Sequence, residues 1–278
     1  MASFSVVTSV SSLNAQANIN QTNALLNRSI NRLSSGMRIN QAGDDAAGLA
    51  VANTYRVDQS VRSQGIRNAN DALSNLQIKD GAMSNIGLMV DRLATLASQA
   101  ASSNTSDDTR ASLDAEFADL VAEIDRQAKI SGLATAETVS VYMSQSADPG
   151  DDEDLSGTVT GSIDAVTADV LGLAEGEEAI AIDTAEAAAT AVNTIKTAVG
   201  TLGTTTNALG SLQNRLTFAI NLATNQNVNF KAAESRLRDA NMAEEASNMT
   251  KFSILSQSGM AALAQANQQS SAVLSLLR

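Results

Sequence analysis

The fold class of this chain is decided by the stretch MSNIGLMVDRLATLASQA at residues 83–100. Its apolar positions recur at alternating spacings of three and four residues, namely at Met83, Ile86, Val90, Leu93, Ala97 and Ala100. This spacing is typical of a helix that buries one stripe against other helices, as in a coiled coil. Residues 44–102 contain no proline, so the pattern predicts one long helix of roughly 85 Å at about 1.5 Å per residue.

Two further helical segments follow from the same kind of pattern. After the polar cluster at residues 102–108, apolar residues spaced by four, three and four predict a second helix, with Thr105-Ser106-Asp107 as its N-cap and Gly132 at its end. Near the C-terminus the alternation returns at residues 209–223 and resumes at 230–240. The long patterns near both ends predict that N- and C-terminal helices pair with one another.

The middle of the chain has strand-like and turn-like patterns. Residues 138–143 alternate in the manner of a strand, residues 148–152 have the composition of a turn, and residues 157–163 suggest a second strand. A β-hairpin is therefore expected within about residues 133–170, followed by an alanine-rich helix over 185–198. The predicted fold is mainly α, with long paired terminal helices in a coiled-coil-like bundle and a small β-hairpin excursion.

The composition removes several classes of chemistry. The chain has no His, no Cys and no Trp, so catalytic triads, cysteine nucleophiles, zinc fingers and disulfides are excluded. We predict no enzyme, no catalytic residue and no cofactor. The adjacent pair Asp44–Asp45 has two interpretations, a metal site or a charge pair at a helix start; no third ligand lies nearby in the sequence, which favours the helix start.

The net charge of −12 is concentrated in one segment. Between Ser131 and Ile195 there are thirteen acidic residues and no Lys or Arg, which leaves eighteen basic and seventeen acidic residues in the rest of the chain. The acidic balance argues against nucleic acid and against an anionic membrane as partners. The acidic segment itself is interpreted as a solvated surface rather than a cation site.

Both ends of the chain lack charge. Met1–Asn27 and Phe252–Leu277 contain no charged residue, yet Ser, Asn and Gln are interspersed among their apolar residues. The N-terminal stretch has neither a basic region nor a continuous apolar core, so it is not a secretory signal peptide. A monomeric bundle is one interpretation, but uncharged helices with apolar stripes are better suited to burial between subunits, where no charge must be desolvated.

Two signatures, one near each end of the chain, carry a family resemblance. NRLSSGMRIN at residues 31–40, followed by GDDAAGLA at 43–50, closely resembles the N-terminal signature of bacterial flagellins. SNMT at residues 247–250 and LAQAN at 263–267 resemble the C-terminal signature. The resemblance covers about residues 1–132 and 185–278, and it indicates a minimal flagellin without large outer domains.

The resemblance implies a domain organisation and a polymerisation surface. Residues 1–43 with 239–278 are expected to form the terminal coiled coil of the filament's inner tube, and residues 44–238 the helical bundle with its hairpin. The apolar residues expected to contact neighbouring subunits are Leu13, Ile19, Leu26, Ile30, Leu33, Leu263, Val273, Leu274 and Leu277.

The resemblance also implies a location and partners. The chain is expected in an extracellular filament, exported by the flagellar type III apparatus without cleavage of a signal peptide. Its implied partners are further copies of itself, an export chaperone, the filament cap and hook-associated proteins. The alternative from the same organelle is a hook-filament junction protein, which shares the terminal helices but does not grow long polymers.

A receptor patch is the last implied feature. Vertebrate Toll-like receptors that detect flagellins read a patch on the long helices, and the matching positions here are Arg92, Leu96, Leu113 and Glu116. Arg92 and Leu96 are four residues apart, and they are expected to flank the buried stripe without belonging to it. A purely structural role for these residues is the alternative.

Overall fold

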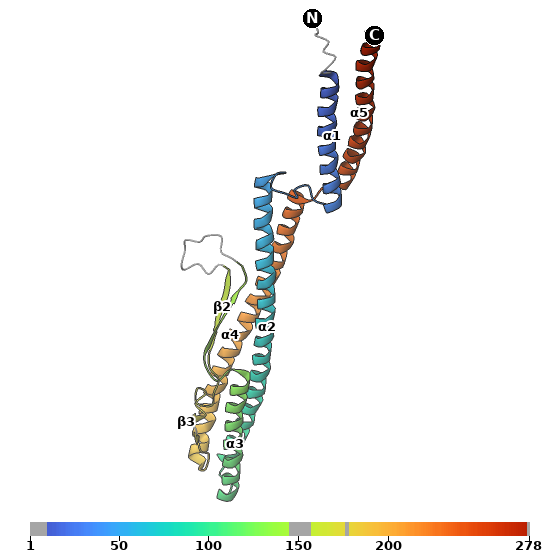
Figure 1. Cartoon of the computed structure of the whole chain (residues 1–278). Coiled ribbons are helices and arrows are strands. Elements are labelled where there is room, and N and C mark those ends of the chain that lie inside the picture. Colours follow the sequence, from blue (N-terminus) through green and yellow to red (C-terminus); the bar gives the residue numbers. More distant parts are fainter. Residues whose placement is uncertain (1–9, 145–156, 176–177, 277–278) are drawn as a thin grey trace. The chain divides into compact units, whose positions relative to one another are not determined.

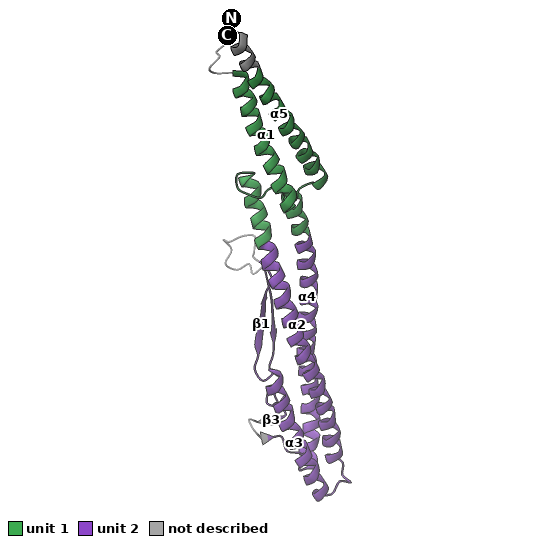
Figure 2. Ribbon diagram, turned by 45° about the vertical axis from the view of Figure 1, so that its right-hand side comes forward, with its two compact units in different colours: residues 1–57, 229–278 green, residues 58–228 purple. Residues whose placement is uncertain are grey.

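The five helices and four short strands described in the chain are divided between two units. The computed structural model describes residues 10–144, 157–175 and 178–276. One unit combines residues 1–57 with 229–278 and is called the terminal unit; the other spans residues 58–228 and is called the central unit (Figure 2). In the part of the chain that is described, no helix combines the length and apolarity needed to cross a membrane.

The helices of the central unit are those that the spacing patterns predict. The long helices α2 and α4 span Ala46–Ala100 and Ala185–Arg238, and α3 spans Asp107–Ser131. Figure 1 shows α3 alongside α2 and α4. All six apolar positions of the stretch 83–100 are buried in one core with residues of α3 and α4. The predicted helical pairing is therefore confirmed.

The ends of α3 are set by local chemistry. Ser106 precedes the helix in extended conformation, and its side chain accepts a hydrogen bond from the backbone N–H of Thr109. Asp107 and Asp108 follow in the first turn, where negative charge stabilises the helix. Gly132 closes the helix with φ +71°, a left-handed conformation that glycine adopts without strain. Both predicted caps are confirmed.

One predicted position on α2 was wrong. Leu96 was expected to lie beside the buried stripe, but it is 1% exposed and belongs to the core. The expectation took Leu93 and Ala97 as the buried stripe, with Leu96 beside it. Because α2 packs against both α3 and α4, its buried stripe is wider and takes in Leu96.

The predicted hairpin is present beside α2 and α4. Strand β1 (Glu137–Tyr142) pairs antiparallel with β2 (Thr158–Ile163), and the expected turn at residues 148–152 lies outside the described residues. Gly65 of α2 has no space for a side chain, because a Cβ would lie 2.1 Å from the Met143 carbonyl oxygen. Gly161 likewise lets β2 approach Leu212 of α4.

A second small hairpin connects the first to α4. Strands β3 (Ala174–Glu175) and β4 (Glu178–Ala179) form a two-stranded sheet that the sequence patterns did not predict. Two carboxylates of α3 hold this connection, since Asp125 accepts a hydrogen bond from the Ala168 N–H and Asp114 accepts one from the Ile182 N–H, both at 2.7 Å.

The terminal unit is built around one helix pair. Helix α1 (Val10–Ser35) runs antiparallel to α5 (Met242–Leu276), as Figure 1 shows. The first turns of α2 and the last turns of α4 also belong to this unit, where the rings of Tyr55 and Phe230 lie 5.6 Å apart. The unit therefore extends beyond residues 1–43 and 239–278 into both long helices.

Candidate assembly surface and helix junction

The helix pair of the terminal unit is joined by specific contacts along its length. Ser12 donates a hydrogen bond to Asn267 at 2.9 Å, and Ser256 donates one to Asn23 at 2.9 Å. Between these two contacts, Ile19 lies directly against Gly259. The pairing is thus partly polar, which agrees with the Ser, Asn and Gln content of both ends.

The helix pair leaves many large apolar side chains exposed. Within the described residues of α1 and α5, side chains between 43% and 66% exposed are Val10, Leu13, Ile30, Met242, Ile254, Leu255 and Met260. In α1, Ser29 is the buried residue. Two helices can cover only one stripe of each other, so a lone pair cannot bury apolar residues on the remaining faces.

The structure places the predicted polymerisation residues in three groups. Leu13 and Ile30 are exposed, at 53% and 43%. Half-buried positions are occupied by Ile19, Leu26, Leu33 and Leu263. The side chains of Val273 and Leu274, and all of Leu277, lie outside the described residues.

The segment that follows α1 and the segment that precedes α5 are joined to each other by backbone hydrogen bonds. Met37 and Asp239 form an isolated antiparallel bridge. The N–H of Arg38 donates to the Arg238 carbonyl at 2.6 Å, and the N–H of Ala240 donates to the Gly36 carbonyl at 2.9 Å. Gly36 has φ +71°, so glycine suits the sharp exit from α1.

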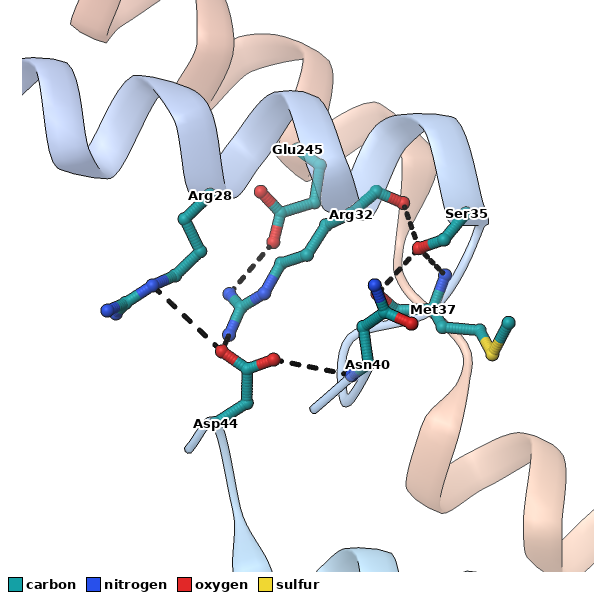
Figure 3. A network of polar contacts seen from close by, with 7 residues as sticks. All are labelled: Arg28, Arg32, Ser35, Met37, Asn40, Asp44 and Glu245. Carbon is teal, nitrogen blue, oxygen red and sulfur yellow. Dashed lines mark hydrogen bonds and ion pairs between the residues drawn. The ribbon is translucent and has the colours of Figure 1, made fainter. Parts of the chain in front are cut away.

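A network of charged side chains lies near Met37 of this bridge (Figure 3). Arg32 on α1 lies 3.2 Å from the Glu245 carboxylate on α5 and 4.0 Å from Asp44, which precedes α2. Arg28 also lies 4.0 Å from Asp44. The side chains of Asp44 and Glu245 are 7% and 10% exposed and that of Arg32 is 25% exposed, so the two Arg32 pairs are largely shielded from solvent. The Arg28 side chain is 57% exposed.

The neighbouring residues Asp44 and Asp45 make different contacts. Asp45 accepts a hydrogen bond from the Gly48 N–H at 2.9 Å and so caps the start of α2, as the helix-start interpretation predicted. Asp44 faces away from the helix, and its second oxygen accepts backbone hydrogen bonds at 3.3 Å from Asn40 and Gln41. Among the described residues, no three His, Cys, Asp or Glu side chains gather as a metal site.

The receptor-patch residues lie where α2 and α3 pack together. Arg92 contacts Glu116 through Nε at 3.0 Å and Nη2 at 2.6 Å, and both side chains are about half exposed. Leu113 is half-buried beside the core. Because Leu96 is buried, it is not part of the exposed patch.

A second exposed ion pair lies on α3 itself. Arg126 binds Glu123 at spacing i, i+3. The hydrogen bond from Arg126 lowers the pKa of the Glu123 carboxyl below its usual 4.5, and the same pairing raises the pKa of Arg126.

Comparisons with known proteins agree with this architecture. Residues 6–133 match the bacterial flagellin N-terminal helical region, and residues 182–277 match the bacterial flagellin C-terminal helical region. The chain is 35% identical to the flagellar filament 33 kDa core protein of Treponema phagedenis, over 97% of this chain and 98% of that protein. It is 32% identical to the flagellin of Bacillus subtilis (strain 168), again over 97% and 98%.

These matches define a class of structural proteins made of paired terminal helices. The chain belongs to the bacterial flagellin family. The signature at residues 31–40 and 43–50 contributes Met37 to the bridge and Arg32 and Asp44 to the charged network at the helix junction.

Proposed function

We propose that this chain is the structural subunit of a flagellar filament for swimming motility, and that its copies polymerise through α1 and α5. The observation that carries the proposal is the set of large apolar side chains that the helix pair leaves exposed. Burying about 100 Å² of apolar surface stabilises an assembly by roughly 2.5 kcal/mol, so several such residues supply a strong driving force.

The lack of charge supports the same proposal. Met1–Asn27 and Phe252–Leu277 contain no Asp, Glu, Lys or Arg. A buried unpaired charge costs several kcal/mol, whereas Ser, Asn and Gln can be satisfied by hydrogen bonds across a subunit contact. Residues 1–43 with 239–278 are therefore proposed as the inner tube, and residues 44–238 as the bundle around it. The polymerisation residues named above are the proposed contacts.

The location and the other partners follow from this role. The filament is extracellular, and we propose that the chain is exported through the flagellar type III apparatus without loss of a signal peptide. Its proposed partners along that route are an export chaperone, hook-associated proteins and the filament cap. No nucleic acid or membrane takes part in the proposed assembly, and no cofactor or catalytic step is required.

Recognition by a vertebrate Toll-like receptor is proposed for the exposed face at α2 and α3. Arg92 and Glu116 offer a cation and an anion side by side, and Leu113 adds a half-buried apolar surface. Arg is enriched among interface hot spots, which makes Arg92 the main proposed contact of this face. Leu96 contributes only from beneath, by packing in the core.

Seeded polymerisation tests the proposed function. Purified chain added to short filament fragments is expected to extend them into filaments many times the seed length in negative-stain electron microscopy. A hook-filament junction protein would add only a few subunits. Seeds that stay at their starting length would contradict the filament role and favour the junction role.

A further inference from the structure

A group of five glycines lies inside the long helices of the central unit, where glycine weakens a helix relative to alanine. They are Gly81 and Gly87 of α2 and Gly200, Gly203 and Gly210 of α4. At four of them an added Cβ would lie more than 4 Å from every described atom beyond the adjacent helix backbone, and at Gly87 it would make an ordinary contact with Leu202 at 3.7 Å. Close packing explains Gly65 and Gly161, but it does not explain these five.

The five glycines lie at one level of the helix pair α2–α4. A Cβ at Gly87 would contact Leu202, and Asp80 lines a surface hollow together with Gly210. Residues 80–87 of α2 therefore lie beside residues 200–210 of α4, and the two segments together are called the glycine belt.

Threonines weaken the α4 segment of the belt further. Thr204 and Thr205 both donate hydrogen bonds to the Thr201 carbonyl, at 2.7 and 3.2 Å, and Thr206 donates one to the Leu202 carbonyl at 2.8 Å. Such side-chain bonds compete with the backbone bonds of a helix and often bend it. Thr205 is also 2% exposed, so a polar residue occupies a position that faces the core.

Other elements hold α4 on both sides of the belt. Before it, Thr194 lies against Gly172 of the connection between β2 and β3, where a Cβ would be 3.4 Å from the threonine methyl group. After it, Leu212 packs against β2, and Arg215 donates a hydrogen bond to the Thr160 carbonyl at 2.8 Å. The belt is the stretch of α4 between these two supports.

We infer that the glycine belt is the compliant part of the central unit, where α4 opens most readily. Local opening begins where a helix is weakest, and kinks in long helices occur where glycines or inserted side-chain bonds weaken the backbone ladder. Opening at the belt lets the two supported parts of the central unit change their mutual angle while each keeps its own contacts. The inference concerns a single chain and does not depend on the proposed function.

Hydrogen exchange of the full-length monomer, followed by mass spectrometry, measures local opening along α4. The backbone amides of residues 200–210 should exchange roughly tenfold faster than those of residues 186–198 and 212–223, once each rate is corrected for sequence. Equal corrected rates in the three segments would overturn the inference.

Alanine substitution then strengthens the belt. The variant with Gly200→Ala, Gly203→Ala and Gly210→Ala adds three methyl groups in open space. Exchange in residues 200–210 should slow by roughly a hundredfold, about fivefold for each glycine replaced in a helix interior. An unchanged exchange rate in this segment would show that the glycines do not set the opening of α4.

The matched control carries three alanines beyond the belt, at exposed positions of the same helix: Thr217→Ala, Asn221→Ala and Asn225→Ala. These substitutions also raise helix propensity, so they should slow exchange around their own positions and leave residues 200–210 unchanged. If the control slows exchange in the belt as much as the glycine variant does, the belt opens only when the whole central unit unfolds, and the inference is wrong.

Discussion

Arg32 joins three segments of the terminal unit through one guanidinium. It extends from the last turns of α1 to Glu245 in α5 and to Asp44 before α2. Breaking a shielded ion pair by removing one partner leaves the other charge uncompensated, which makes each member of the network dependent on the others. Polar residues of the signature at residues 31–50 therefore stabilise the junction of the terminal helices.

Arg110 has a comparable role in the central unit, where α2 meets α3. Its buried side chain donates to the carbonyls of Ala100 and Thr105 and pairs with Asp107, which closes the turn between α2 and α3. Arg110→Met should lower the free energy of unfolding by about 2 kcal/mol, because buried carbonyls lose their donors. Thermal or urea unfolding measures this change.

The matched control for Arg110→Met is Arg126→Met, on the same helix. Arg126 makes an exposed ion pair, so its loss should change stability by less than about 1 kcal/mol. Equal effects of the two substitutions would show that Arg110 is not needed to close the turn.

Glu123 provides a test of electrostatics at a single group. Its folded pKa is lowered by the hydrogen bond from Arg126. The pairing therefore stabilises the fold fully above pH 4.5, the usual pKa, and this contribution is lost as the pH falls through the lowered folded value. An NMR titration should find the Glu123 midpoint below 4.5, and Arg126→Gln should move it back up. An unchanged Glu123 midpoint in Arg126→Gln would contradict the pairing.

At the scale of elements, the sequence predicted the helices well because their signals are local and periodic. The stripe from Met83 to Ala100 and the caps Ser106 and Gly132 all follow from spacing and backbone chemistry. Leu96 was misplaced because the number of helices around α2 is a tertiary property. The Ile19–Gly259 contact and the Arg110 turn were not foreseen, since each joins residues whose proximity depends on how the chain folds.

The apolar surface of α1 gives a prediction about charge. Leu13 is 53% exposed in the single chain, so Leu13→Asp should leave the fold intact. In an assembly the carboxylate would be buried and unpaired, and the critical concentration for polymerisation should rise by more than roughly a hundredfold. Sedimentation after seeding measures this concentration.

Leu13→Asn and Ser112→Asp are the matched controls for this experiment. The first keeps the shape of the aspartate without its charge, and the second adds a charge on the exposed face of α3. Both should polymerise better than Leu13→Asp. Normal assembly of Leu13→Asp, with unchanged circular dichroism, would remove α1 from the subunit contact.

The α2–α3 face gives a prediction about recognition. Arg92 and Glu116 are exposed, so their ion pair adds little to stability. If the face is read by the receptor, Arg92→Ala should weaken signalling by monomer roughly thirtyfold, the equivalent of about 2 kcal/mol. A reporter-cell titration compares it with Thr138→Ala on the exposed part of β1. Equal potency of both variants would make the Arg92 pair purely structural.

At the scale of the whole molecule, the two units differ in how far their apolar residues are buried. The central unit has a continuous apolar core of its own and carries the acidic segment. The terminal unit has a helix pair whose large apolar residues remain exposed. A structural subunit needs both properties, because it must be stable alone and also retain a surface that is covered only in the polymer.

The most direct test of this account is the accessibility of Ile254 in monomer and filament. Ile254 is 57% exposed in α5, and Ile254→Cys introduces a single thiol into a chain that has none. A water-soluble maleimide should label this thiol rapidly in the monomer, much more slowly in seeded filaments, and rapidly again after depolymerisation. Equal labelling rates in monomer and filament would contradict the claim that neighbouring copies cover the apolar face of the helix pair.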